Sequence, residues 1–414
     1  MKKQIAISLS PNTDAQDVRT AIRALANPPS WKHQKYVEDV ESRLSMLLPG
    51  RHIVAVSSGR QALYDILRAF GIGSGDEVIL QAFTCIAVPE SIIWTGAKPV
   101  YADIDSQTYG VTLASVAAKV TPTTRAIIVQ HTFGIPAPVE EIVDFAHERG
   151  IIVIEDCAHA LGSTIGGKAV GTLADAAVIS FGRDKMISSV FGGAAVFADK
   201  TVADKAKGFA AERPYPPMAW VIQQLLHPIM FAAIVPTYFT GFGKFLLVLA
   251  QRIRLLSRAV EKTERTGQMP PHIAWRYSPA LAQILIRQLT ALPTLLARRR
   301  AIAARYRAAL ANTSAQLARV PDGASPSWLR FPMQIENPKK MLHAARQHSM
   351  MLGDWYDAPL VPADASVSVF HYTPGSCPVA EDIALHVINL PTYPGLSDEQ
   401  VERVIAFCME FYGH

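Results

Sequence analysis

Charged residues and cysteines are scarce in this chain of 414 residues. Only 18% of its residues are Asp, Glu, Lys or Arg, and a net charge of +5 is too dilute for a nucleic-acid-binding surface. The four cysteines, Cys85, Cys157, Cys377 and Cys408, lie far apart without metal-ligand spacing, which argues against a disulfide framework and a zinc site. We therefore expect a protein of the reducing cytoplasm that binds neither nucleic acid nor metal.

The N-terminal sequence MKKQIAISLSPNTD has no apolar core of signal-peptide length, so export is not expected. Hydrophobic residues make up 50% of the chain, enough to bury a large core in one two-domain subunit. Strand-like apolar runs occupy residues 53–56, 78–80, 99–102, 126–130, 151–154, 176–180 and 194–197, and helical patterns alternate with them. This alternation predicts an α/β fold with a mostly parallel sheet wrapped by helices.

Residues 151–193 carry three groups that could meet at one site. The run 151–154 leads into Asp156, and the next run contains Ser180 and is followed by Lys185. Ligands of open α/β sheets bind beyond the carboxyl ends of the strands, so these groups could converge. A lysine that forms a Schiff base and a carboxylate that keeps a pyridine nitrogen protonated are what pyridoxal phosphate requires. By spacing alone, a loop carboxylate and a solvated lysine are the commoner explanation.

A second candidate site follows the run 53–56, where Ser57 and Ser58 lead into a helix. Gly59 would let the backbone approach a ligand closely, and the free amides around Gly59, Arg60 and Gln61 could bind a phosphate. A strand-to-helix turn without any ligand is the alternative, because such turns outnumber phosphate sites.

Several motifs occur together in a fixed order. They are SSGRQAL (57–63), GDEVI (75–79), KPVYADID (98–105), HTFGIP (131–136), EDCAHALG (155–162), SFGRDK (180–185), FGG (191–193) and NLPTYPGLS (389–397). As an ordered set, they resemble the DegT/DnrJ/EryC1/StrS family of sugar aminotransferases. The resemblance covers nearly the whole chain apart from one central segment.

The resemblance implies a pyridoxal-phosphate-dependent transferase of fold type I, with a large domain at 1–210, an inserted segment at 211–266 and a smaller α+β domain at 267–414. It implies a homodimer with the active site at the subunit interface. Lys185 would carry the cofactor, Asp156 would hold its ring nitrogen, and its phosphate would lie against the residues Ser58, Gly59, Arg60, Gln61 and Ser180. The amino group, expected from glutamate, would pass to a keto sugar on a nucleotide or lipid carrier in cell-surface polysaccharide or glycoconjugate biosynthesis.

The chain departs from the family pattern at three positions. Cys85 stands where the family usually has an aromatic residue that stacks on the cofactor ring; Cys85 could pack there instead, or be an inert buried cysteine. His159 replaces a glutamine, and could bond the ring hydroxyl or be structural. Ala274 replaces an asparagine that reaches the phosphate of the partner subunit, and Arg276 or a group of the inserted segment could compensate. The loop with His371 and Tyr372 is expected to face the substrate.

Residues 214–243 contain no Asp, Glu, Lys or Arg. Lys244 comes next, and further basic residues follow at Arg252, Arg254, Arg258, Lys262 and Arg265. Pro228 and Pro236 are expected to break the run into pieces too short to span a bilayer. Short apolar helices followed by basic residues favour peripheral contact with an anionic membrane through residues 214–265. A hydrophobic dimer interface or additional core remains the alternative.

Two other functions stay open at this stage. Family members that act as sugar dehydratases carry histidine in place of the cofactor lysine, so Lys185 argues against that activity. A catalytically inactive or regulatory member associated with the membrane is the other alternative, which Cys85 and Ala274 favour.

Overall fold

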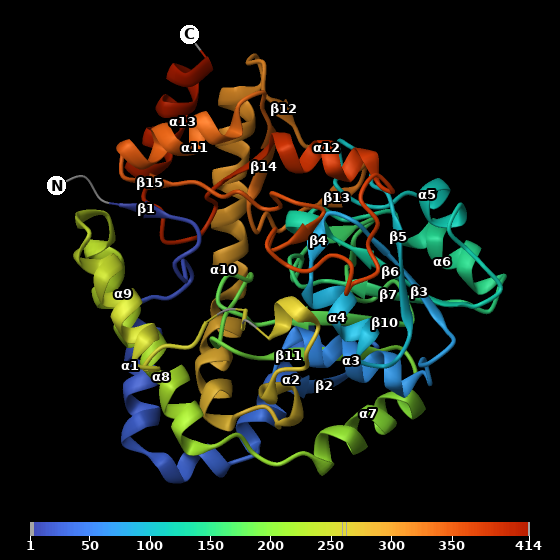
Figure 1. Cartoon of the computed structure of the whole chain (residues 1–414). Helices are drawn as coiled ribbons and strands as arrows, with labels where there is room; N and C mark the ends of the chain where they lie inside the picture. The colour runs from blue at the N-terminus through green and yellow to red at the C-terminus, as the bar shows by residue number, and fades with distance from the viewer. Residues whose placement is uncertain (1–3, 259, 262, 413–414) are drawn as a thin grey trace.

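A seven-stranded sheet lies at the centre of the computed structural model, which describes residues 4–258, 260–261 and 263–412 (Figure 1). Lys262 and the predicted domain ends 1–3 and 413–414 lie outside the described residues. In spatial order the strands are β2 (His52–Val56), β11 (Gly193–Phe197), β10 (Ala176–Ser180), β7 (Ile152–Asp156), β6 (Thr124–Gln130), β3 (Glu77–Gln81) and β5 (Lys98–Ala102). β11 runs antiparallel to both neighbours, and the other adjacent pairs are parallel. The predicted mostly parallel sheet is confirmed.

Both faces of the sheet are apolar. Successive side chains of a strand point to opposite sides, and both sets of side chains pack into hydrophobic clusters. On β6, Ile128 packs into the cluster that includes helix α3, and Ile127 packs into a separate cluster with helix α6. The helices of this part of the chain are α1 (Ala15–Ala26), α2 (Lys35–Leu47), α3 (Gly59–Ala69), α4 (Ala87–Ile93), α5 (Leu113–Ala117), α6 (Val139–His147) and α7 (Lys200–Glu212). Helices therefore cover both faces, as the alternation of patterns predicts.

The C-terminal part holds a smaller antiparallel sheet in the order β12 (Gln316–Leu317), β14 (Phe331–Gln334) and β17 (Val387–Leu390). Helices α11 (Pro338–Gln347), α12 (Pro378–His386) and α13 (Asp398–Tyr412) accompany it. It lies above the large sheet in Figure 1, and the 32-residue helix α10 (Pro279–Leu310) runs between the two parts. The loop between β15 (Met350–Met351) and β16 (Leu360–Val361) returns to the N-terminal part of the chain, because β16 pairs with β4 (Thr84–Cys85) in a separate two-stranded sheet. Strand β1 (Ile5–Ala6) pairs with β15.

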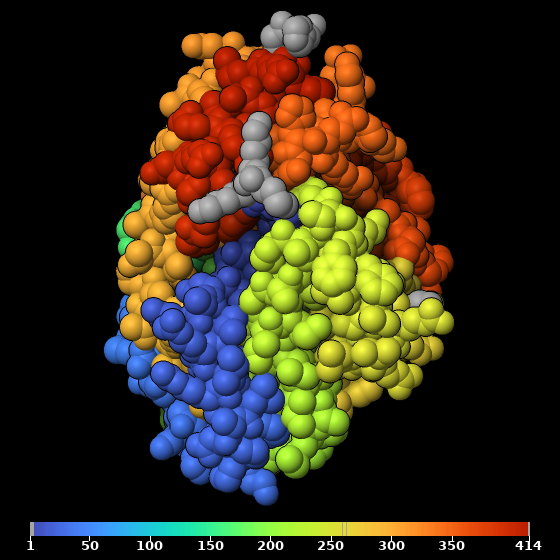
Figure 2. Space-filling view, turned by 90° about the vertical axis from the view of Figure 1, so that its left-hand side faces the viewer, coloured from blue at the N-terminus to red at the C-terminus, as the bar shows by residue number. Residues whose placement is uncertain are grey.

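The apolar segment forms helix α8 (Met218–Ile234), a 3-10 turn at Val235–Thr240 and helix α9 (Phe242–Arg252). The prediction that Pro228 and Pro236 break the run into pieces too short to span a bilayer is wrong. Pro228 lies inside α8 and Pro236 in the 3-10 turn that continues it, and the helical run Met218–Thr240 is 23 residues long. The direction changes instead at Gly241, whose φ of 85° is the left-handed conformation that glycine adopts readily. Figure 2 shows this segment exposed on one side of the molecule, beside the N-terminal helices.

Two helical runs in the described chain are long and apolar enough to cross a membrane, Met218–Thr240 and Pro279–Leu310. In the most apolar 18 residues of each run, 50% of the second run is buried and 39% of the first run is buried. Helix α10 packs against α2, α1 and α13, whereas α8 packs mainly against α1. Length and composition are weak evidence for a span, because the core helix of a soluble protein shows the same features.

Candidate active site

A pocket of about 390 Å³ opens where the carboxyl ends of the parallel strands meet. This volume lies within the range of about 300–1,000 Å³ typical of small-molecule sites. Eight of the nine residues predicted to bind the cofactor line it: Ser58, Gly59, Arg60, Cys85, Asp156, His159, Ser180 and Lys185. The chain therefore brings together groups that lie up to 127 positions apart in the sequence.

One end of the pocket is shaped for a small anion. Ser58 caps helix α3, and its hydroxyl accepts from the Gln61 backbone N–H at 3.2 Å. A Cβ on Gly59 would lie 2.9 Å from the Cβ of Ser180, and a Cβ on Gly193 would lie 2.5 Å from the Gly59 nitrogen. Glycine at both positions lets three backbone segments meet at the start of α3. Free amides and the positive end of the helix dipole suit a phosphate group there.

Gln61 is the predicted cofactor residue that does not line this pocket. Its side chain accepts from the Ser57 backbone N–H at 2.6 Å and donates to the Trp275 carbonyl at 3.3 Å. Its own backbone N–H already faces the hydroxyl of Ser58. Gln61 thus supports the turn that presents Ser58, and its contact with a phosphate remains a prediction.

Arg60 extends from the first turn of α3 into a cluster of buried carboxylates. It forms an ion pair with Glu264, and its Nε lies 3.9 Å from Glu90. Burial raises the pKa of Glu90 to about 8, although the charge of Arg60 opposes this shift. Glu90 is therefore largely protonated at neutral pH, and Glu264 is the carboxylate that balances Arg60.

Lys185 and Asp156 both face the same pocket, and both are removed from water. Burial lowers the pKa of the Lys185 amine, against the raising effect of Cys85 and Asp156. Burial also raises the pKa of Asp156, against the backbone N–H of Ala158, which donates to its Oδ1 at 2.9 Å. Each group is easier to neutralise than in water, so either could exchange a proton or pair with an opposite charge of a ligand.

His159 lies next to Asp156 with a defined tautomer. Its Nδ1 accepts from the Phe133 backbone N–H at 3.3 Å, so the proton of the neutral ring is on Nε2. Burial lowers the pKa of His159 well below its usual value, which keeps the ring neutral. Nε2 lies 3.3 Å from the hydroxyl of Tyr356. A neutral N–H donor at this place fits the predicted bond to a ring hydroxyl.

Several pocket residues were not predicted from the sequence. Trp355 and Tyr356 come from the loop between β15 and β16, and Arg183 comes from the SFGRDK motif. The adjacent aromatic residues Trp355 and Tyr356, flanked by Asp354 and Asp357, were the available signal. Cys85 lines the pocket but offers only a small thiol, whose pKa is raised by burial. The aromatic ring that lies over the Lys185 amine, that of Trp355, comes from the C-terminal part of the chain.

The segment after α9 forms part of the pocket within the same chain. Val260 and His272 line it, and Ser57 donates to the His272 carbonyl at 2.6 Å. His272 Nε2 has no hydrogen-bond partner among the described residues. Burial lowers the pKa of His272 to about 3, so its ring is neutral. This segment therefore contributes to the wall at the Ser57 end of the pocket.

Two expected contributors lie elsewhere. Arg276 donates to the backbone carbonyls of Arg213 and Ala211 and does not line the pocket of its own chain; its contact with the phosphate of a partner subunit stays a prediction. The prediction that the loop with His371 and Tyr372 faces the site is wrong. Its histidine is exposed, and its tyrosine donates to Glu381 at 2.6 Å, outside the pocket.

Comparisons with known proteins agree with this geometry. The sequence profile described as the DegT/DnrJ/EryC1/StrS aminotransferase family matches residues 12–213 and 248–408. The chain is 30% identical over 366 residues to UDP-N-acetyl-3-dehydro-alpha-D-glucosamine 3-aminotransferase of Acidithiobacillus ferrooxidans, covering 88% of this chain and 85% of the relative. It is 28% identical over 393 residues to GDP-perosamine synthase of Escherichia coli O157:H7, covering 92% of each.

The chain is also similar to a solved structure, DesV of S. venezuelae in complex with a ketimine intermediate. The TM-score is 0.74 and the sequence identity is 25%, and the match covers 97% of this chain and 95% of the DesV chain. The gap in the profile match, residues 214–247, coincides with the apolar segment, as the departure from the family pattern predicts. The chain is a pyridoxal-phosphate-dependent aminotransferase of fold type I, and it belongs to the DegT/DnrJ/EryC1/StrS aminotransferase family.

Proposed function

We propose that this enzyme transfers an amino group from glutamate to a keto sugar held on a nucleotide or lipid carrier, in the synthesis of a cell-surface polysaccharide or glycoconjugate. The observation behind the proposal is that Lys185, Asp156 and the start of helix α3 face one pocket. The printed names of the relatives, a dehydro-sugar aminotransferase and a perosamine synthase, support a keto-sugar acceptor.

Pyridoxal phosphate supplies, when bound, an aldehyde and an electron-accepting ring. Lys185 is the residue that would hold the aldehyde carbon and then move a proton with its Nζ, because burial lowers the pKa of its amine towards the working pH. Asp156 would hold the ring nitrogen in its protonated form, and a cationic neighbour would in turn favour the ionised carboxylate. Ser58, Gly59 and Ser180 would hold the phosphate at the start of α3.

The first test is the absorption spectrum of the purified protein with pyridoxal phosphate, before and after glutamate is added. We expect a bound-cofactor band that glutamate shifts, and a changed band with a loss of at least about 10³-fold in amino transfer for Lys185→Ala. Lys168→Ala is the matched control, because that lysine forms an ion pair with Glu140 at the surface.

The possible outcomes separate the remaining functions. A band that does not respond to glutamate but responds to another amino acid would change the donor and keep the enzyme class. No band at all in the presence of added cofactor would refute the proposal and favour a regulatory member of the family. Elimination of water from the sugar without amino transfer would indicate a dehydratase, against the presence of Lys185.

We also propose that the enzyme works as a cytoplasmic homodimer attached to the inner face of the cell membrane through residues 214–265. Five side chains, here called the α9 apolar face, are between 40% and 62% exposed: Phe242, Phe245, Val248, Leu249 and Ile253. Lys244, Arg252, Arg254 and Arg258 are exposed beside them in the sequence, and no acidic residue occurs between residues 214 and 260.

Helix α9 is 11 residues long, or about 16 Å, whereas the hydrocarbon core of a bilayer is about 30 Å thick. Its buried face packs Ala250 into a cluster with α8. A short helix with one packed face, one exposed apolar face and basic neighbours suits the interface of an anionic leaflet. The same face could instead join two subunits, and the experiment must separate these outcomes.

Co-sedimentation with vesicles of phosphatidylcholine, with and without phosphatidylglycerol, tests the attachment. We expect binding that requires the anionic lipid and falls roughly tenfold in the double variant Phe245→Ser/Val248→Ser, because two large apolar contacts are lost. Ile22→Ser is the matched control, since Ile22 is 50% exposed on α1. Sedimentation velocity without lipid tests the dimer. Failure to bind vesicles, together with a dimer that the double variant dissociates, would make this face a subunit interface and reject the membrane contact.

A further inference from the structure

The wall of the pocket beside Lys185 presents an aromatic ring that comes from the C-terminal part of the chain. The Nζ of Lys185 lies 5.6 Å from the centroid of the Trp355 ring. The ring of His159 lies almost parallel to Trp355, with centroids 5.6 Å apart and an interplanar angle of 9°. The ring of Tyr356 is inclined to Trp355 by 13°. Trp355 therefore faces the amine, and the rings of His159 and Tyr356 lie nearly parallel to it.

Trp355 is held firmly in this position. Asn389 on β17 accepts from the Trp355 backbone N–H at 3.1 Å and donates to its carbonyl at 2.8 Å. The guanidinium carbon of Arg330 lies 3.5 Å from the centroid of the Trp355 ring, and Arg330 is itself almost fully buried. An arginine stacked on an indole is favourable, and it fixes the plane of the ring. The orientation of Trp355 is thus set without any ligand.

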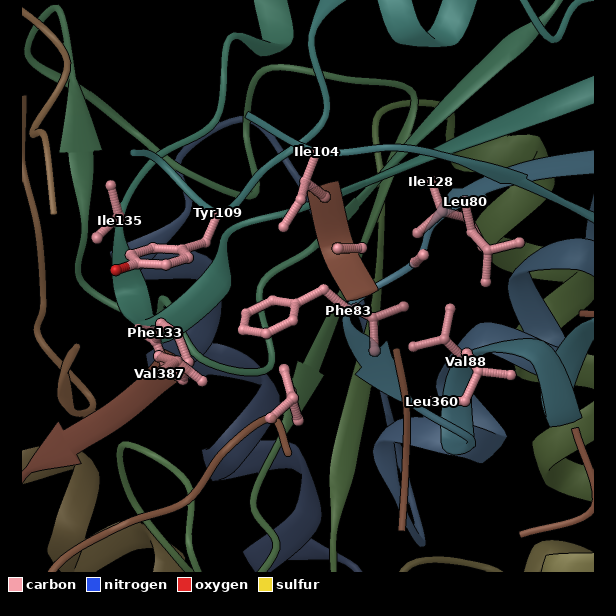
Figure 3. Packing of buried hydrophobic residues seen from close by; sticks show 14 of the residues in the cluster. Leu80, Phe83, Val88, Ile104, Tyr109, Ile128, Phe133, Ile135, Leu360 and Val387 are labelled. Carbon is pink, nitrogen blue, oxygen red and sulfur yellow. The ribbon is translucent and has the colours of Figure 1, made fainter. Parts of the chain in front are cut away.

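The loop that carries Trp355 runs directly beside Cys85. The Thr84 backbone N–H donates to the Pro359 carbonyl at 3.0 Å, and the Ile86 N–H donates to the Val361 carbonyl at 3.0 Å. Tyr356 packs edge-on against Phe83 at 5.3 Å, and Phe83 in turn lies beside Tyr109 and Phe133 in the core (Figure 3). The two stretches therefore form one wall, in which residue 85 supplies a small thiol and residue 355 supplies a ring.

We infer that Trp355 is a positioning residue that covers the cofactor ring, in the role that the small side chain of Cys85 cannot fill. A flat ring joined to Lys185 needs an apolar surface to fix its plane, and offset stacking on an aromatic side chain provides one. This inference rests on the proposed role of Lys185, and it adds a residue from outside the large sheet to the cofactor site.

The test measures the dissociation constant of pyridoxal phosphate from the intact chain by absorbance titration. Trp355→Leu is expected to raise this constant about tenfold, while Trp355→Phe, which keeps a ring, stays within about threefold of the wild type. Cys85→Tyr combined with Trp355→Leu is expected to recover most of the lost affinity, because it returns an aromatic ring to the same wall. Trp94→Leu is the control, since the Trp94 ring donates to the Gly267 carbonyl outside the pocket.

Several results would overturn the inference. Affinity for the cofactor that is unchanged in Trp355→Leu, with only the KM for the sugar increased, would assign Trp355 to the sugar. Equal losses in Trp355→Leu and Trp355→Phe would mean that the ring itself is not what matters. Melting temperatures of the cofactor-free variants show whether they remain folded. Wild-type binding of the cofactor with no response to Trp355 substitution would reject this inference alone, whereas absence of wild-type binding would reject the proposed function.

Discussion

The pocket and the inserted helices differ in their relation to the family. The strand ends and the start of α3, which hold most of the pocket, lie within the matched residues 12–213, whereas α8 and the first half of α9 fall in the unmatched gap. The two regions are nevertheless joined by partly buried polar contacts. Arg213, at the beginning of the insertion, pairs with Asp65 of α3, and Ser257, after α9, bonds both α8 and the pocket residue Arg183. Helix α8, which lies in the unmatched gap, is therefore linked to the pocket residue Arg183 through Ser257, which lies within the matched residues.

Among substitutions at these contacts, we expect Asp65→Asn to cause the largest loss of stability. Both oxygens of Asp65 accept from Arg213, at 2.6 and 2.5 Å, and Asp65 is only 1% exposed. Removing one partner of a buried pair leaves the other charge without compensation, so we expect the free energy of unfolding to fall by about 3 kcal/mol. Urea denaturation measures this loss. Asp204→Asn, in an exposed pair with Lys200 on α7, should leave the midpoint unchanged, and equal effects of the two substitutions would contradict the argument.

A pH dependence is expected where the segment after α9 meets α3. Burial raises the pKa of Glu90 to about 8 in the folded chain, whereas the unfolded chain titrates near 4.5. Between these two pH values the folded state binds more protons than the unfolded state. Glu90 therefore contributes its full stabilisation of the fold at low pH, and the free energy of unfolding falls as the pH rises from about 4.5 through about 8. Glu90→Gln should flatten that slope between pH 5 and 8. Glu141→Gln on exposed α6 is the control, and an unchanged slope in Glu90→Gln would show that Arg60 keeps Glu90 ionised.

The sequence predicts the parts of the site that depend on strand ends and local turns. Asp156, Ser180 and the Ser58–Gly59 turn follow buried apolar runs, and parallel strands bring their carboxyl ends to one edge. Lys185 lies at the same edge because it comes shortly after the strand that ends at Ser180. These residues line one pocket because sheet topology, which alternating patterns reveal, brings the strand ends together; their roles towards a cofactor stay predictions.

The predictions fail where the outcome depends on packing between distant segments. Trp355 reaches Lys185 only because β16 pairs with β4, and no local pattern indicates that pairing. Pro228 is tolerated inside α8, where tertiary contacts stabilise the helix despite the lost backbone hydrogen bond. The side-chain role of Gln61 also depends on a distant segment: it accepts from the Ser57 backbone N–H and donates to the Trp275 carbonyl, while the contact of its backbone amide with a phosphate stays a prediction.

The smallest expected effect tests whether α8 influences the pocket. The Ser257 hydroxyl donates to Gln224 of α8 at 2.7 Å, and the Ser257 carbonyl accepts from Arg183 at 2.8 Å. Ser257→Ala removes the bond to α8 and the bond that the Ser257 hydroxyl accepts from Arg183, and it keeps the carbonyl bond, so we expect a loss of about 1 kcal/mol in unfolding free energy and a two- to fivefold rise in the KM for the sugar. Ser366→Ala, at an exposed site, is the matched control. A change in stability without a change in KM would mean that α8 supports the fold but does not influence the pocket.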